Sequence, residues 1–365
     1  MLESADKIKT VFIYNYVHVM RAHRPHMVQK DDQYVFLHQA VMEALTCGNT
    51  EVAPQDLRIM VNKLSRDTKS CKNAGFGEEF KRLQFVSDCL SSGEETTAAF
   101  QPSNIDKNRF RNIPPCKWSP LAIFRFFFFC VLVNTARVHL MSSQPDGDYI
   151  NASFVNDYKE RDAYILTQAP LDNTIGDFWR MVSQYNIGTV VMLNNLKEGK
   201  QNYPQYWPSQ GSARHDDITV QLLSENTSNN MTTRRFSVIN TKPSKRTTTV
   251  QHIHFTEWVN EDSCPDPQKI LDLMTAVQQS QQQSGNGTIV FQCSDGVGRS
   301  GCVASIMSVI ERVKIEQTVD VFQTIKLIRA KRPGAVDSLD RYVFCYKTVL
   351  AYLDSFNAYS NFSDC

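Results

Sequence analysis

The stretch that decides the fold is residues 288–313, TIVFQCSDGVGRSGCVASIMSVIERV. A short apolar run ends in Cys293, and a pattern with helical periodicity follows Arg299. The glycines of the stretch let the backbone turn tightly between these two parts. The stretch therefore predicts a strand, a tight Cys-x5-Arg loop and a helix in direct succession.

The loop has the composition of an anion-binding site. Backbone N–H groups at the start of a helix bind anions, because they are unpaired and the helix dipole faces the ligand. Arg299 adds a bidentate clamp for a phosphate, and the same positive field lowers the pKa of Cys293 and favours a nucleophilic thiolate. Ser300 can hydrogen-bond the sulfur. The simpler alternative is that Cys293 is a small buried apolar residue.

The sequence around the loop alternates between two patterns. Apolar runs typical of strands occupy residues 164–169, 189–195, 249–258 and 288–292. Longer amphipathic runs typical of helices occupy residues 174–185 and 267–283. We therefore expect an α/β fold, with a twisted sheet and helices packed around it.

The composition is that of an ordinary globular protein. The 365 residues, 42% of them hydrophobic, allow one large domain with an appendage, or two small domains. Because the 39 basic residues are balanced by 38 acidic ones, the net charge does not favour nucleic acid or a membrane surface as a partner. The ten cysteines contain no CxxC pair and no metal-ligand spacing, so we expect reduced thiols and no metal. The apolar run at residues 121–133 contains Arg125 and is too short to span a membrane, which takes about 20 residues.

An internal repeat divides the chain. Residues 11–45 return as residues 319–353, at a constant offset of 308. Each copy shows a helical pattern, a proline break and a second amphipathic helix. The first copy's Arg21, Arg24, Pro25, Asp32, Tyr34 and Phe36 recur as Arg329, Arg332, Pro333, Asp340, Tyr342 and Phe344. The recurrence of two arginines with one aspartate points to a helix-pair scaffold rather than to chemistry.

The repeat sets the predicted boundaries. The second copy follows the Cys-x5-Arg loop, whereas no such loop precedes the first copy. We interpret residues 1–47 as the C-terminal helical remnant of a first domain, and residues 48–105 as a linker with leading helices. Residues 106–357 then form a complete second domain, and residues 358–365 form a tail.

Taken together, the motifs resemble the receptor-type protein tyrosine phosphatases, specifically the second, membrane-distal intracellular domain of LAR-type receptors. The match runs from residue 11 to about residue 359 and is interrupted at 116–133. It rests on KNRFRNI, DYINASF, AYILTQAPL, DFWRMV, QYWP, HFTEW and CSDGVGRSG. The resemblance implies a highly twisted mixed sheet flanked by helices, and hydrolysis of phosphotyrosine without a metal or an organic cofactor.

The resemblance also implies roles for individual residues. Cys293 would attack phosphorus and Arg299 would hold the phosphoryl oxygens, while an acid from the HFTEW loop would protonate the leaving tyrosine. Glu198 would hold Arg299 by a carboxylate–guanidinium pair, the alternative being a solvated surface acid. The implied substrate-binding residues are Phe110, Asn112, Ser294, Asp295, Gly296, Val297, Gly298 and Arg299, with Gln292, Glu198 and Trp258 in support and Ser300 beside the nucleophile.

Two departures from the family pattern concern the nucleophile. Gln292 stands where the family usually has histidine, and it has no titratable charge, so Cys293 should be less acidic. Asp295 stands where alanine is usual, as in catalytically silent relatives. A carboxylate about 6 Å from the sulfur or from a bound phosphate opposes each unit of negative charge by about 3 kcal/mol at an effective dielectric constant near 20.

The other departures concern the acid and the substrate. Asn260 replaces the general acid and has no proton to give, a loss of roughly 10²–10⁴-fold in rate. Phe110 replaces the usual tyrosine and can still stack on a substrate ring. Asn112 replaces the aspartate that anchors the substrate backbone, and Asp337 replaces the glutamine that positions water.

Because the nucleophile and the arginine remain while their surroundings differ, we expect weak or no phosphatase activity and a regulatory pseudophosphatase role. The expected partners are phosphotyrosine proteins or peptides, another receptor phosphatase domain, or cytosolic scaffold proteins. Two alternatives remain open: an active phosphatase in which Glu261 or Asp262 supplies the acid, and a non-functional truncated or misspliced product. The resemblance implies a single-pass receptor with this part in the cytoplasm, and we expect no transmembrane segment in the chain itself.

Residues 116–133, CKWSPLAIFRFFFFCVLV, interrupt the match. Codons for residues 116–118 can contain a splice-donor-like GTAAAT, and codons for residues 131–133 can contain an acceptor-like TTTTAG, so we interpret the insert as a retained intron. The alternative is a surface insertion, although a mostly apolar loop would be an exposed patch prone to aggregation. A transcript without these codons would support the intron, and inclusion in all transcripts would exclude it.

Overall fold

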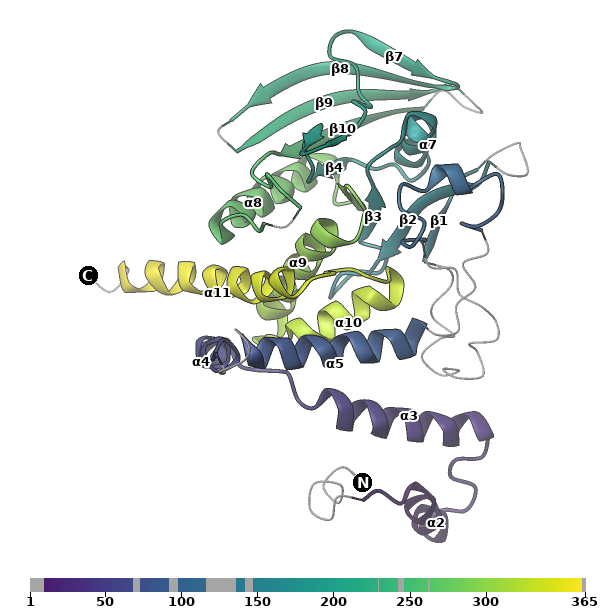
Figure 1. Ribbon diagram of the computed structural model, residues 1–365, viewed down its shortest axis with the longest axis vertical. Helices are drawn as coiled ribbons and strands as arrows, with labels where there is room; N and C mark the ends of the chain where they lie inside the picture. Colours follow the sequence, from purple (N-terminus) through teal and green to yellow (C-terminus); the bar gives the residue numbers. More distant parts are fainter. Residues whose placement is uncertain are drawn as a thin grey trace.

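A computed structural model describes residues 10–67, 73–91, 98–115, 136–141, 147–228, 230–241, 246–261 and 263–362. In these residues, helices flank a nine-stranded sheet, and a further helical pair lies at the N-terminal end (Figure 1). The α/β class and the twisted mixed sheet predicted from the sequence are confirmed.

The sheet has the strand order β1-β2-β3-β11-β4-β10-β9-β8-β7. Its strands are β1 Arg137–His139, β2 Tyr149–Val155, β3 Tyr164–Gln168, β4 Thr189–Met192, β7 Ser212–His215, β8 Ile218–Thr227, β9 Met231–Asn240, β10 Arg246–Phe255 and β11 Ile289–Cys293. A small ribbon pairs β5 Lys197–Glu198 with β6 Gln201–Asn202. Strand β11 is parallel to β3 and β4, and β10 is parallel to β4, whereas the other pairs are antiparallel. The loop after β11 therefore leaves the parallel centre of the sheet at its carboxyl edge, where α/β folds bind ligands.

The helices are α2 Ile13–His23, α3 Asp31–Cys47, α4 Leu57–Leu64, α5 Ala74–Ser91, α7 Ile175–Gln184, α8 Pro267–Ser284, α9 Gly298–Glu316, α10 Val321–Lys331 and α11 Leu339–Phe362. Short 3-10 turns lie at Pro54–Asp56, Ile105–Lys107 and Asp172–Thr174. Local sequence explains the ends of α8. Asp266 caps its first turn by accepting from the Gln268 N–H, Pro267 occupies the first helical position, and Gly285 ends the helix in the left-handed conformation.

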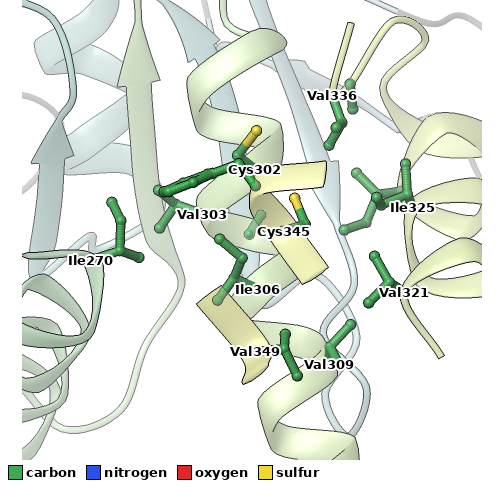
Figure 2. Close-up of a cluster of buried hydrophobic side chains, with 14 of the residues drawn as sticks. Ile270, Cys302, Val303, Ile306, Val309, Val321, Ile325, Val336, Cys345 and Val349 are labelled. Carbon is green, nitrogen blue, oxygen red and sulfur yellow. The ribbon is translucent and has the colours of Figure 1, made fainter. Parts of the chain in front are cut away.

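Each face of the sheet has its own hydrophobic core, because side chains alternate along every strand. In β11, Val290 packs on the side of α7, whereas Ile289 and Phe291 pack on the side of α8, α9 and α11. Strand β11 is buried throughout for this reason, which accounts for its continuous apolar sequence. Figure 2 shows Val303 and Ile306 of α9 among side chains of α8, α10 and α11.

The predicted leading helices belong to this packing. Leu57 and Val61 of α4, and Phe76, Phe80 and Leu83 of α5, are buried in the same cluster as α9, α10 and α11. An isolated antiparallel bridge between Val52 and Val319 adds a backbone connection. Residues 48–91, where described, therefore pack against α9, α10 and α11.

The internal repeat is a structural repeat. Helices α2 and α10, and likewise α3 and α11, begin 308 residues apart. Arg21 donates from Nε and Nη2 to the carbonyl oxygens of residues 27 and 28 at 2.9 and 2.7 Å. Arg329 does the same to residues 335 and 336 at 2.8 and 2.7 Å. The predicted scaffold role fits this arginine, since it fixes the turn between the two helices in both copies.

The two copies differ in burial. Tyr14 is 70% exposed, whereas its counterpart Phe322 is fully buried. Phe36 is 38% exposed and Phe344 only 3%. The helix face that α10 and α11 bury in the core beside α8 and α9 is thus largely open in α2 and α3, which lie apart from the sheet in Figure 1.

Three features complete the description. Within the described ranges, no helix is long and apolar enough to cross a membrane. The cysteines that the structure describes as free thiols are Cys47, Cys264, Cys293, Cys302 and Cys345. The predicted insert at 116–133, Asp262 and residues 363–365 of the predicted tail lie outside the described residues.

Candidate active site

The predicted strand, loop and helix are present. Strand β11 ends at Cys293 and α9 begins at Gly298. The turn between them depends on Gly296, whose φ of 73° lies in the left-handed region. A Cβ atom at Gly296 would lie 2.5 Å from backbone atoms of Thr167 and Gln168. The loop 293–299 is therefore folded directly against the end of β3.

The carboxylate of Asp295 turns into this loop. Its Oδ1 accepts hydrogen bonds from the backbone N–H groups of Val297 at 2.9 Å and Gly298 at 3.1 Å. The same oxygen accepts from the thiol of Cys293 at 3.0 Å. These N–H groups stand at the start of α9, where an anion would bind. The predicted anion position is thus partly filled by a side chain of the loop itself.

The thiol of Cys293 is fully buried. Burial first, and then the charge of Asp295, raise the pKa of Cys293 to about 12, against the smaller effect of the hydrogen bond with Ser300. The sulfur is 3.3 Å from Ser300 Oγ and accepts from the Gly296 N–H at 3.2 Å. At neutral pH the thiol is protonated. This corrects the lowered pKa that the loop composition alone predicts, because the carboxylate inside the loop reverses the local field.

Arg299 is held behind the loop by Glu198. Nη1 and Nη2 of Arg299 donate to the two carboxylate oxygens of Glu198 at 2.6 and 2.9 Å, and Nη1 also donates to the Leu193 carbonyl at 3.0 Å. Glu198 is only 8% exposed, so it is not a solvated surface acid. Among the described residues, the buried Nε–H of Arg299 has no hydrogen-bond partner. It is a donor that a phosphoryl oxygen can use.

Gln292 belongs to a buried chain of hydrogen bonds. Its Nε2 donates to Asn194 Oδ1 at 2.5 Å, and its Oε1 accepts from the Tyr206 hydroxyl at 2.9 Å. The same hydroxyl lies 2.8 Å from Nε2 of His252. Because a hydroxyl has one hydrogen, His252 must donate from Nε2 to Tyr206. Burial lowers the pKa of His252 well below its usual value, so the ring is neutral. Gln292 is thus tied into the core of the sheet.

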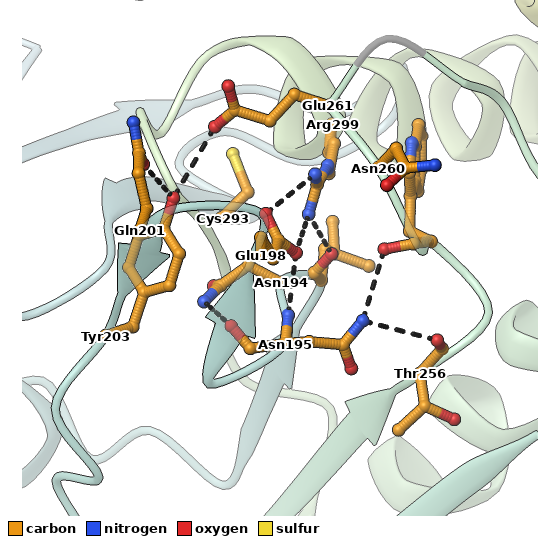
Figure 3. Close-up of polar contacts among 12 residues, drawn as sticks. Asn194, Asn195, Glu198, Gln201, Tyr203, Thr256, Asn260, Glu261, Cys293 and Arg299 are labelled. Carbon is orange, nitrogen blue, oxygen red and sulfur yellow. Dashed lines mark hydrogen bonds and ion pairs between the residues drawn. The ribbon is translucent and has the colours of Figure 1, made fainter.

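The segment 258–261 follows β10 and carries the predicted replacement for the general acid (Figure 3). Trp258 is buried and its indole N–H donates to the Ser263 carbonyl at 2.6 Å. The exposed amide of Asn260 lies beyond Arg299 as seen from Cys293 in Figure 3. Glu261 turns the other way, and its Oε1 is 3.5 Å from the Tyr203 hydroxyl.

Phe110 and Asn112 lie on a segment anchored beside the loop. The backbone N–H of Arg109 donates to Gln168 Oε1 at 2.9 Å. Ala169, which follows Gln168 in the chain, donates from its backbone N–H to the Ser294 carbonyl at 3.4 Å. Phe110 is half-buried and Asn112 is exposed. This anchoring places the predicted substrate-recognition segment next to loop 293–299.

Arg332, predicted as part of the helix-pair scaffold, also contacts loop 293–299. It is fully buried, and its Nε donates to the Gly296 carbonyl at 3.1 Å. Its Nη2 donates to the Asp295 carbonyl at 3.5 Å. Arg332 therefore fixes the backbone of loop 293–299. The repeat offers no signal for this contact, because the counterpart Arg24 has no such loop before it in the chain.

Asp337, predicted in place of a water-positioning glutamine, forms an ion pair with Arg341. Arg341 also donates to the backbone carbonyl of Glu261. The sequence reasoning did not single out Arg341. In the described part of the chain, no group of three or more His, Cys, Asp or Glu side chains is arranged to hold a metal ion.

Comparison with known sequences places this site in context. A sequence model of the family described as protein-tyrosine phosphatase matches residues 1–43 and 104–351. The two matched segments end at residues 43 and 351, again 308 positions apart.

Individual relatives cover nearly the whole chain. It is 37% identical over 366 residues to receptor-type tyrosine-protein phosphatase alpha of Mus musculus, which covers 99% of this chain and 42% of the relative. It is 37% identical over 364 residues to receptor-type tyrosine-protein phosphatase S of Gallus gallus, which covers 99% of this chain and 23% of the relative. It is 35% identical over 367 residues to receptor-type tyrosine-protein phosphatase epsilon of Mus musculus, a match that covers 99% of this chain and 50% of the relative. The chain thus spans half or less of the length of these relatives.

Proposed function

Because the chain belongs to the protein-tyrosine phosphatase family, we propose that residues 106–357 act as a regulatory pseudophosphatase domain of a receptor-type phosphatase. The domain binds phosphotyrosine proteins or peptides, another receptor phosphatase domain, or cytosolic scaffold proteins. It hydrolyses phosphotyrosine weakly or not at all. The observation that carries this proposal is the position of Asp295 inside loop 293–299.

Asp295 opposes a phosphate in two ways. Its Oδ1 occupies the N–H groups of Val297 and Gly298, so a phosphate must compete for them. Its charge also repels the phosphate. Even at about 6 Å, twice the 3.0 Å between its Oδ1 and the Cys293 sulfur, a dianion would lose about 6 kcal/mol, or roughly four powers of ten in affinity, at an effective dielectric constant near 20. A phosphorylated ligand therefore binds well only when Asp295 is displaced or neutralised.

Two further features support weak turnover. The protonated thiol of Cys293 is a poor nucleophile, because the thiolate is the reactive form. Asn260 cannot protonate a leaving phenolate, so the tyrosine leaves unassisted, at a rate lower by roughly 10²–10⁴-fold. The buried Arg299–Glu198 pair remains intact, which supports retention of a folded phosphate-type site without efficient chemistry.

We also propose that the domain is the second, membrane-distal one of a LAR-type receptor, on the cytosolic side of the membrane. Residues 1–47 would then be the end of the first phosphatase domain. The repeat of α2–α3 in α10–α11, with the same arginine contacts in both turns, supports this assignment. The two matched segments, which end at equivalent positions, support it as well.

One observation favours the alternative of an active phosphatase. Glu261 turns toward Tyr203 rather than toward solvent alone, with 3.5 Å between its Oε1 and the hydroxyl. In Figure 3 its carboxylate lies on the same side of Arg299 as Cys293. In this alternative, Glu261 donates the proton that Asn260 lacks.

The deciding experiment is turnover of a phosphotyrosine peptide by the full chain. We expect no release of phosphate above that of Cys293→Ser, and at least about 10²-fold more from the double variant Asp295→Ala/Asn260→Asp. Turnover by the unchanged chain that disappears in Cys293→Ser would overturn the pseudophosphatase proposal. If this turnover were also lost in Glu261→Gln, Glu261 would be identified as the acid.

A further inference from the structure

Arg341 connects separate parts of the site. It lies in the first turn of α11, and its Nη1 forms an ion pair with the carboxylate of Asp337. Its Nη2 donates to the backbone carbonyl of Glu261. One side chain therefore ties the start of α11 to segment 258–261.

The same guanidinium packs against the backbone of loop 293–299. A Cβ atom built on Gly298 would lie 2.8 Å from Cζ of Arg341 and 3.2 Å from Oδ1 of Asp337. Any residue larger than glycine at position 298 would push this ion pair away. The ion pair thus touches both loop 293–299 and segment 258–261.

The contact with Glu261 is charge-assisted. Only 10% of the Arg341 side chain is exposed, against 37% of Asp337. Burial by itself lowers the pKa of Arg341, but Asp337 outweighs it, and the pKa of Arg341 is raised overall. Hydrogen bonds from a permanently charged guanidinium are about twice as strong as neutral ones.

The internal repeat shows that the helix pair does not need these charges. Asp337 and Arg341 correspond to Gln29 and Gln33 at the offset of 308. In the first copy, Gln33 Oε1 accepts from the backbone N–H of Gln29 at 2.7 Å, a contact within its own turn. Glutamine at both positions is therefore compatible with the same turn and helix start.

Other side chains contact the first half of segment 258–261. Asn195 Nδ2 donates to the Trp258 carbonyl at 3.4 Å, and the Trp258 ring packs 5.8 Å from that of Phe344. At the second half, the Glu261 side chain reaches Tyr203 only at 3.5 Å, the outer limit of a hydrogen bond. The Asn260 carbonyl accepts from the backbone N–H and the hydroxyl of Ser263, both at 3.4 Å. Among these described contacts of the second half, the hydrogen bond from Arg341 is the shortest and the only one from a charged donor.

We propose that Arg341, held by Asp337, is a positioning residue that keeps segment 258–261 against loop 293–299. Ligands then reach the loop when the contact between Arg341 and Glu261 breaks. Segments that cover a site must move to admit ligands, and this contact shifts the equilibrium toward the covered state. The inference concerns access to the site and stands whether or not the domain hydrolyses phosphotyrosine.

The test is ¹⁹F NMR of the full chain with 5-fluorotryptophan at its four tryptophans. The indole N–H of Trp258 donates to the Ser263 carbonyl, so displacement of the residues between them changes the surroundings of this ring. Trp258→Phe assigns the resonance. We expect Arg341→Gln to raise the population of a displaced Trp258 state at least about tenfold, because a charge-assisted hydrogen bond is lost. Asp337→Asn should act in the same direction but less strongly.

Arg312→Gln is the matched control. The side chain of Arg312 is 15% exposed and ion-paired with Glu51, Glu316 and Asp320, near the C-terminal end of α9 rather than at loop 293–299. We expect no change at Trp258 in this variant. An unchanged Trp258 resonance in Arg341→Gln overturns the proposal. Equal changes at the buried Trp179 and Trp207 also overturn it, because they would report a general loosening of the core.

Discussion

The thiol of Cys293 donates a hydrogen bond to the carboxylate of Asp295, 3.0 Å away in the same loop. Two negative charges at this distance repel each other strongly, so a thiolate at Cys293 and an ionised Asp295 exclude one another. The loop retains the geometry of an anion site, yet it carries its own anion. This single contact links the buried, protonated sulfur to the occupied N–H groups of α9.

Asp295→Asn should make Cys293 more reactive. The amide has nearly the same shape and can still accept from the backbone N–H groups, but it removes the charge that helps raise the pKa of Cys293. We expect this pKa to fall by at least about one unit, which increases the thiolate fraction about tenfold at a given pH below the pKa. The measurement is the rate of alkylation of Cys293 by iodoacetamide between pH 7 and 10, followed by mass spectrometry.

Cys264 is an internal control for this experiment. Burial raises the pKa of Cys264 to about 12, and Asp295 is not among the groups that perturb it. Its alkylation should stay unchanged. If both cysteines accelerate together, the substitution has loosened the whole domain and the electrostatic explanation fails.

Gly296→Ala should destabilise the domain by about 3 kcal/mol or more, because it combines an unfavourable positive φ with backbone overlap. The added Cβ atom would lie 2.5 Å from backbone atoms of β3. The control is Gly211→Ala, where φ is 65° and nothing lies within 4 Å of the added atom. For Gly211→Ala we expect the free energy of unfolding to fall by only about 1–2 kcal/mol. The measurement is urea denaturation of both variants. An equal loss of stability in the two would show that the loop can move away from β3 without a cost in free energy.

Glu198→Ala should lower the free energy of unfolding by about 3–5 kcal/mol, because it leaves the guanidinium of Arg299 buried without its partner. Arg299 is only 1% exposed, so water does not replace the carboxylate. The comparison is Asp354→Ala, which breaks an ion pair with Arg58 whose side chains are 60% and 43% exposed. Exposed pairs contribute about 0–1 kcal/mol. The measurement is the free energy of unfolding of both variants by chemical denaturation. Similar losses of stability in the two would show that the buried pair contributes no more than the exposed one.

The centre of the fold could be predicted from local patterns. The helices expected at residues 174–185 and 267–283 are α7 Ile175–Gln184 and α8 Pro267–Ser284. The turn from strand to helix after Cys293 follows from glycines and from an apolar run that is buried on both faces. Strands β8 and β9 were not predicted. Each is ten residues long, with many polar side chains on an open face, and their apolar alternation is weak.

The site residues that sequence reasoning missed are defined by long-range contacts. Whether Asp295 turns into the loop or away from it is a choice of side-chain rotamer, which no local pattern determines. Arg332 meets Gly296 across 36 positions, and Arg341 meets Glu261 across 80. Such contacts follow only once the strands and helices have been assembled.

Acid should destabilise the domain through two buried histidines of β10. Burial first, and then neighbouring positive charge, lower the pKa of His252 well below its usual value and that of His254 to about 4. Both rings are neutral in the folded state. In the unfolded chain each histidine gains a proton near pH 6.5, so the unfolded state binds more protons below that pH.

The free energy of unfolding should therefore fall as the pH drops from 6.5 toward 4, by about 1.4 kcal/mol per pH unit for each histidine. Between pH 7 and pH 5 the expected loss is about 2 kcal/mol per histidine. The measurement is urea denaturation across this range. His254→Gln should remove about half of the slope, whereas the control His18→Gln, on the exposed side of α2, should leave it unchanged. A flat profile between pH 7 and pH 5 would show that the two rings are hydrated or already charged in the folded domain.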